Sequence, residues 1–218
     1  MDGCGRGLGG RQDLQLYANS MTDDPSAGWE SIAATFAQRR SNIGVDVVKR
    51  WLQSLKPAGA IVDIGCGTGL PVSKTIAEAG YEVYGIDPSP TLLATFQHNI
   101  PDATAACEAA ETSRFFNRRF EGAVAVGLMF LLPESSQCSL IKSVAKALHP
   151  GGHFLFSAPR QICTWNDNLT GRLSRSLGEE RYTELLAKAG FHLVDTYEDE
   201  GSNHYFHART TDIAVHNL

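Results

Sequence analysis

The stretch that most constrains this chain is residues 60–69, A-I-V-D-I-G-C-G-T-G. Ile61, Val62 and Ile64 form a short apolar run, which is typical of a central strand of a parallel sheet that is buried on both faces. The glycines that follow allow positive φ angles and let a ligand approach bare backbone. Pro71 is well placed to open a helix. The stretch therefore predicts a strand–loop–helix edge against which a nucleotide-like ligand lies.

The spacing of the glycines and one acidic residue indicate which kind of nucleotide. Gly65, Gly67 and Gly69 follow a G-x-G-x-G pattern, whereas the dinucleotide fingerprint is G-x-G-x-x-G with a pyrophosphate at the helix N-terminus. Asp63, at the end of the strand, would repel a pyrophosphate and would favour a cationic or zwitterionic ligand. An NAD(P)-dependent oxidoreductase is an alternative interpretation, and both the spacing and Asp63 oppose it.

A second acidic residue follows the next predicted strand, which spans residues 81–87. Asp87 ends this strand 22 residues after Gly65. In a βαβ unit, an acid near this distance accepts hydrogen bonds from the hydroxyls of a ribose. The alternative is that Asp87 only caps the helix that the sequence predicts over residues 90–99.

The run V-D-I-G-C-G-T-G, followed by Asp87, resembles motif I and the ribose-binding acid of the class I S-adenosylmethionine-dependent methyltransferases. The resemblance includes F-E-G-A-V at residues 120–124 and L-H-P-G-G at residues 148–152, and it covers about residues 60–208. It implies a Rossmann-like α/β fold with a seven-stranded, mostly parallel sheet, one antiparallel strand and helices on both faces. It also implies that S-adenosylmethionine is the cofactor.

The same resemblance implies a role for each cofactor-binding candidate. The acid after the third strand and its neighbour, Glu108 and Ala109, would contact the adenine, and Glu111 is an alternative to Glu108. Residues 127–129 would lie behind the methyl group and the sulfur. The complete set of cofactor-binding candidates is Asp63, Gly65, Cys66, Gly67, Gly69, Asp87, Pro88, Glu108, Ala109, Gly127, Leu128, Met129 and Arg40.

Apolar periodicity predicts the remaining elements. Helices are expected over residues 29–39, 45–55, 71–79, 133–148 and 179–189, and strands over residues 104–107, 120–127, 153–157, 191–197 and 203–208. The residues 149–152, H-P-G-G, are expected to form a turn.

The sequence also predicts how the chain is organised around an acceptor. We expect residues 1–20 to be a disordered N-terminal extension and residues 21–218 to form a single domain. The resemblance implies that residues 21–57 are a helical cover over the cofactor and that Trp29 and Phe36 line the acceptor pocket, although these two would alternatively only pack their helix on the sheet. Residues 158–178, which are polar and lack periodicity, would be a substrate lid loop. The complete set of acceptor-binding candidates is Trp29, Phe36, Trp165 and Tyr205.

Catalysis by methyl transfer needs a general base only when the acceptor holds its proton at neutral pH. His204 is the candidate base, with Tyr17 and Tyr205 as alternatives. A non-catalytic protein that binds S-adenosylmethionine remains an alternative to an enzyme.

Composition and absent motifs narrow the partners. A net charge of −5 argues against nucleic acid. No (D/N)-P-P-(Y/F) motif follows the fourth predicted strand, and the chain has no Pro-Cys dipeptide, so a small-molecule acceptor is favoured. Five cysteines without a C-x-x-C pair suit reduced thiols in the cytoplasm and offer no metal site. No apolar run is long enough to span a membrane, and nothing in the sequence indicates the oligomeric state.

Overall fold

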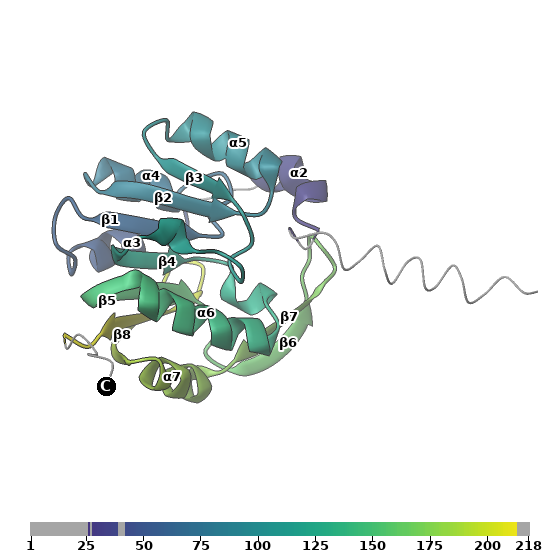
Figure 1. The fold of residues 1–218 in the computed structure, drawn as a ribbon. Helices are drawn as coiled ribbons and strands as arrows, with labels where there is room; N and C mark the ends of the chain where they lie inside the picture. The colour runs from purple at the N-terminus through teal and green to yellow at the C-terminus, as the bar shows by residue number, and fades with distance from the viewer. Residues whose placement is uncertain (1–25, 27, 39–41, 213–218) are drawn as a thin grey trace, which may run out of the picture.

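A computed structural model describes residues 26, 28–38 and 42–212. Its main sheet has seven strands in the order β3-β2-β1-β4-β5-β9-β8 (Figure 1). Among these strands only β9 runs opposite to the other six, which are parallel to one another, and this confirms the predicted topology. The strands are β1 (Ala60–Ile64), β2 (Glu82–Asp87), β3 (Thr104–Cys107), β4 (Phe120–Ala125), β5 (Leu148–Ser157), β8 (Phe191–Glu198) and β9 (His204–Thr210). The predicted extension 1–20, Tyr17 and Arg40 lie outside the described residues.

Helices cover both faces of the sheet, as predicted, because successive side chains of a strand point to opposite faces. The helices are η1 (Glu30–Ile32), α2 (Ala33–Gln38), α3 (Val45–Leu52), α4 (Val72–Glu78), α5 (Pro90–Asn99), η2 (Phe115–Asn117), η3 (Met129–Leu131), α6 (Glu134–Ala147) and α7 (Glu179–Lys188). Ile61 packs with α3, α4 and α5 on one face, whereas Val62 packs with α6 and α7 on the other. No helix in this described part is long and apolar enough to cross a membrane.

Several boundaries differ from the sequence expectation. The helix expected over 29–39 begins as the 3₁₀ turn η1 and continues as α2, and the helix expected over 45–55 ends at Leu52. The expected turn at 149–152 lies instead inside β5, where the register with β4 shifts after the pair Phe120–Leu148. Gly151, with a φ of 75°, bends the strand there without ending it.

The expected lid loop, residues 158–178, is not a loop. It contains a two-stranded antiparallel hairpin, β6 (Ile162–Asn166) and β7 (Leu173–Leu177), which is separate from the main sheet. The side chain of Gln137, on α6, joins this hairpin to the main body. Its amide nitrogen donates to the carbonyls of Leu132 and Arg175 at 2.9 and 3.3 Å, and its oxygen accepts from the Tyr182 hydroxyl at 2.7 Å. Because Gln137 is completely buried, these bonds fix the middle of β7 against α6.

Candidate active site

The glycine-rich loop leaves β1 at the carboxyl edge of the sheet and stays paired to β2. The amides of Gly65 and Cys66 both donate to the carbonyl of Ile86, at 2.8 and 3.0 Å. Gly65 and Gly67 have φ angles of 73° and 54°, which lets the chain turn sharply over the strand ends. A Cβ on Gly67 would lie 3.2 Å from the Phe36 ring, and one on Gly65 would lie equally close to Leu128. The loop is therefore bare backbone between two apolar walls.

Asp87, at the end of β2, is held firmly beside this loop. Its Oδ2 accepts from the Gly67 amide at 2.8 Å, and its Oδ1 accepts from the Ser89 amide at 2.9 Å. Only 6% of the residue is exposed. Burial raises the pKa of the Asp87 carboxyl above its ordinary value, while the two amide donors oppose the rise. Each oxygen takes one of these bonds and keeps capacity for a ligand hydroxyl.

Two of the predicted loop residues lie beneath the loop. The Asp63 carboxylate is buried and accepts from the Ser73 hydroxyl on α4 at 2.6 Å. A Cβ on Gly69 would lie 2.7 Å from Ile100 and 2.8 Å from Phe96, so α5 can pack this close to the loop only because residue 69 has no side chain. Neither Asp63 nor Gly69 lines the cavity described below.

The N-terminal segment is anchored over the same edge by Glu30. The Thr91 hydroxyl and amide donate to its two carboxylate oxygens at 2.6 and 3.2 Å, and the Ser89 hydroxyl also donates to it. An acid is favoured here because it lies at the N-terminus of α5. Trp29, which precedes Glu30, packs edge-on against Phe36 with ring centroids 5.1 Å apart.

The opposite wall comes from the residues that follow β4. The Gly127 amide donates to the Ser157 hydroxyl of β5 at 2.8 Å, and the chain then enters η3. Leu128, Phe130 and Leu131 line the cavity, whereas Met129 is completely buried in the core. Met129 therefore points into the core, away from the position behind the methyl group that the sequence predicted for it.

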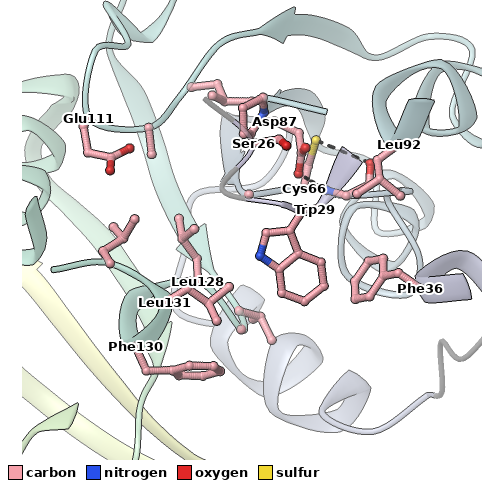
Figure 2. A pocket seen from close by; sticks show the side chains of 18 of the residues that line it. Ser26, Trp29, Phe36, Cys66, Asp87, Leu92, Glu111, Leu128, Phe130 and Leu131 are labelled. Atoms are coloured by element: carbon pink, nitrogen blue, oxygen red, sulfur yellow. Dashed lines mark hydrogen bonds between the residues drawn. The ribbon is translucent and has the colours of Figure 1, made fainter. Parts of the chain in front are cut away.

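These walls enclose a cavity of about 280 Å³. Figure 2 shows the indole of Trp29 between Phe36 and Leu128, with Glu111 and Phe130 farther along the wall. The predicted residues that line the cavity are Trp29, Phe36, Gly65, Cys66, Gly67, Asp87, Pro88, Gly127 and Leu128. The lining residues that the sequence did not single out are Ser26, Ile86, Leu92, Ala110, Val126, Phe130, Leu131, Leu132 and Asp167.

The thiol of Cys66, which lines the cavity, is protonated. Burial raises its pKa, and the negative charges of Asp63 and Asp87 add to the rise.

At the end near β3, the acid on the wall differs from the predicted one. Glu108 and Ala109 do not line the cavity, whereas Ala110 and Glu111 do. The Glu108 carboxylate instead accepts from the Ser113 hydroxyl at 2.6 Å and stabilises the loop after β3. Glu111, the alternative to Glu108, is the residue that reaches the cavity.

His204 and Trp165 line a second cavity of about 370 Å³ beside the first. The two cavities share Phe130, whose ring centroid lies 5.3 Å from that of Trp165. The Nε2 of His204 is buried and has no hydrogen-bond partner within the part of the chain that the structure describes, and burial lowers the pKa of its imidazole. Tyr205 lines neither cavity: its hydroxyl donates to Asp199 at 2.9 Å, and only 1% of the residue is exposed.

Comparison with known proteins agrees with this geometry. A family model described as "Methyltransferase domain" matches residues 36–196. The chain is 29% identical over 134 residues to YqeM of Bacillus subtilis, named as a methyltransferase, covering 59% of this chain and 54% of that protein. The chain spans about half the length of the curated relatives it matches.

Two solved structures show the same fold. The CcbJ methyltransferase of Streptomyces caelestis superposes with a TM-score of 0.72 at 16% identity, over 86% of this chain and 99% of that one. CalS10, an amino pentose methyltransferase of Micromonospora echinaspora solved with bound S-adenosylmethionine, has a TM-score of 0.63 at 17% identity, over 95% and 100%.

Proposed function

Because this chain belongs to the class I S-adenosylmethionine-dependent methyltransferases, we propose that it transfers a methyl group from S-adenosylmethionine to a small-molecule acceptor in the first cavity. The observation that carries the proposal is Asp87. It is a buried carboxylate at the carboxyl end of β2, aligned by the Gly67 and Ser89 amides, and it has the acceptor capacity that the two hydroxyls of a ribose need.

The cavity suits the charge of this cofactor. Its charged lining residues in the described part of the chain are Asp87, Glu111 and Asp167, all of them acids. A sulfonium with an ammonium group is favoured beside such a wall, whereas a pyrophosphate would be repelled. This argument, together with the glycine spacing, favours S-adenosylmethionine over NAD(P).

Each wall has a proposed part in holding the cofactor. Asp87 holds the ribose, residues 65–67 support the cofactor with bare backbone, and Glu111 with Ala110 bounds the adenine. Gly127 and Leu128 lie beside the sulfur. Asp63 and Gly69 act indirectly, since they fix the loop and its packing on α5.

When bound, S-adenosylmethionine would supply an electrophilic methyl group on a sulfonium, which an acceptor would attack in line with S-adenosylhomocysteine as the leaving group. The contribution of the protein is to align the acceptor and exclude water. Trp29, Phe36 and Phe130 provide an apolar enclosure for this purpose. The segment 158–178, which contains the β6–β7 hairpin, is the proposed lid. His204, in the adjoining cavity, is the proposed base for acceptors that must lose a proton.

We also propose a cytoplasmic location, because the four cysteines in the described residues are unpaired thiols.

Ligand-induced stabilisation tests the proposal. S-adenosylhomocysteine at a hundredfold excess over its Kd should stabilise the protein by about 2.7 kcal/mol, which is measured as a rise in melting temperature. NADH at the same concentration should leave the melting temperature unchanged. Transfer of radiolabelled methyl groups to a small-molecule extract then separates an enzyme from a non-catalytic binder. A rise with NADH alone would favour the oxidoreductase instead.

The adenine contact gives a sharper prediction on two neighbouring acids. Glu111→Gln should weaken binding of S-adenosylhomocysteine about three- to tenfold, since a charged hydrogen-bond acceptor is lost. Glu108→Gln is the matched control and should change the Kd less than twofold, because this side chain bonds to Ser113 outside the cavity. Isothermal titration calorimetry measures both Kd values. If Glu108→Gln weakens binding more than Glu111→Gln does, then Glu108 contacts the adenine instead.

A further inference from the structure

The tip of the β6–β7 hairpin places one carboxylate on the cavity wall. Asp167 Oδ1 accepts three hydrogen bonds, from the amides of Leu169 and Thr170 at 3.0 and 2.7 Å and from the Thr170 hydroxyl at 2.8 Å. Two backbone bonds of 2.8 Å close the turn, from the Asp167 amide to the Arg172 carbonyl and from the Gly171 amide to the Asp167 carbonyl. Oδ2 has no hydrogen-bond partner among the described residues. One oxygen therefore fixes the carboxylate, and the other stays available.

Two contacts hold this turn at the cavity. Trp165, two residues before Asp167, packs against Phe130 of the η3 wall with ring centroids 5.3 Å apart. On the other side, a Cβ on Gly28 would lie 3.4 Å from the Nε of Arg172, so the turn meets the N-terminal segment. In Figure 1 the hairpin reaches from the α7 side of the molecule toward α2. Asp167 thus lies where the two covering segments come together.

The proposed cofactor contacts leave Asp167 unused. Asp87 and Glu111, the other two acids on the wall, stand at and beyond the ends of β2 and β3, where the ribose and adenine are proposed to bind. Asp167 comes from the hairpin, whose Trp165 packs against Phe130, and Trp29 and Phe130 line the same cavity as Asp167. A carboxylate in a cavity that aromatic rings also line favours a positively charged or hydrogen-bond-donating group.

The same wall disfavours an anionic acceptor. No Lys, Arg or His is among the described residues that line the cavity. A carboxylate or phosphate on the acceptor would lose its water beside three acids and gain no cationic side chain from the described lining in exchange.

We propose that the methyl acceptor is a small-molecule amine whose N–H donates to Oδ2 of Asp167, with the apolar part of the molecule against Trp29 and Phe130. The lone pair of the neutral amine would attack the methyl carbon, the C–S bond would break to leave S-adenosylhomocysteine, and the excess proton on the methylated nitrogen would pass to solvent. This inference rests on the proposed function, since it assumes that the cofactor occupies the strand-end side of the cavity. It assigns Asp167 to acceptor recognition and predicts no contact between Asp167 and the cofactor.

Three probes that share a 2-phenylethyl group test the charge preference: 2-phenylethylamine, 2-phenylethanol and 3-phenylpropionate. Binding of each to the protein saturated with S-adenosylhomocysteine is measured by calorimetry. We expect the amine to bind at least about tenfold more tightly than the carboxylate, with the alcohol between them. Equal or tighter binding of the carboxylate would overturn the inference.

Two variants of the turn then test the residue. Asp167→Asn keeps the oxygen that accepts the three bonds, so the turn remains formed, and it should weaken amine binding about tenfold. Asn168→Ala, an exposed neighbour outside the cavity wall, is the matched control and should leave amine binding unchanged.

The affinity for S-adenosylhomocysteine distinguishes the possible failures. We expect both variants to bind it within twofold of the wild type. If Asp167→Asn weakens this binding as much as amine binding, Asp167 belongs to the cofactor site and the inference is wrong. If Asp167→Asn leaves the amine preference intact, the inference is also wrong while the proposed function stands. Failure of the wild type to bind S-adenosylhomocysteine would refute both.

Discussion

Asp87→Ala should weaken S-adenosylhomocysteine binding by about 100-fold or more. The estimate follows from two ribose hydrogen bonds to a charged acceptor, each worth roughly 1.5–3 kcal/mol. The variant also leaves the buried amides of Gly67 and Ser89 without their acceptor, so the glycine-rich loop loses its fixed position. Calorimetric titration of the folded variant measures the change in Kd.

Asp87→Asn separates these two effects. One oxygen of the asparagine still accepts an amide bond, so the loop should keep more of its position, while the negative charge is lost. We expect an intermediate affinity, with a melting temperature closer to the wild type than that of Asp87→Ala. If Asp87→Ala binds S-adenosylhomocysteine as tightly as the wild type does, then the ribose does not contact this residue.

The strand-end geometry was predictable because local sequence and fold agree there. The apolar run before Gly65 specifies a buried parallel strand, and the spacing to Asp87 fixes the end of the neighbouring strand. In the parallel register Ile64 pairs with Ile86, so the loop after one strand necessarily meets the acid that ends the other. The structure confirms the fold that follows from this pairing.

Predictions failed where a chain segment turns after its strand. β3 ends at Cys107, which pairs with Asp87, and the loop that follows turns Glu108 toward Ser113 before Glu111 reaches the cavity. In the same way, the 3₁₀ turn η3 buries Met129 between two lining residues. Sequence order alone does not tell which residue of such a turn points inward.

The hairpin escaped prediction because polarity and burial disagree in its short strands. The apolar Ile162 and Leu173 are exposed, whereas the polar Ser174 and Ser176 of β7 are buried, so the sequence does not show which face of the hairpin is covered. What holds it is the ring of Trp165 on Phe130 and the hydrogen bond from the buried Gln137 to the middle of β7. Both are contacts between segments far apart in the sequence. A turn signal was nevertheless present in Asp167 and Gly171, residues of types that favour turns.

A second large effect, on stability, comes from a pair of histidines that the antiparallel register of β5 and β9 brings together. His153 Nδ1 and His207 Nε2 are 2.8 Å apart, and the Tyr197 hydroxyl lies 2.8 Å from His207 Nδ1. His207 is completely buried. Burial lowers the pKa of both imidazoles to about 4, and for His153 the nearby Arg209 adds to the effect.

The protein should therefore lose stability between pH 6.5 and pH 4. The unfolded chain takes up protons near the ordinary histidine pKa of about 6.5, whereas the folded protein resists protonation until about pH 4. The stabilisation is complete above pH 6.5, falls as the pH drops through this window, and is lost below pH 4. One independent, fully buried histidine with this pKa would contribute about 3 kcal/mol. Since the rings are coupled and His153 is partly exposed, we expect about 3–4 kcal/mol for the pair.

Urea unfolding of the wild type and of His207→Gln, at intervals from pH 7.5 to pH 4.5, measures this contribution. Carboxylates also titrate in this range, so the informative quantity is the difference between the two proteins in how the free energy of unfolding changes with pH. His207→Gln should be less stable at pH 7.5, because its partners His153 and Tyr197 are disturbed, and its stability should fall by about 2 kcal/mol less on acidification. His98→Gln, an exposed histidine on α5, should retain the wild-type dependence. Equal pH dependence in His207→Gln and the wild type would mean that the buried pair does not titrate in this window.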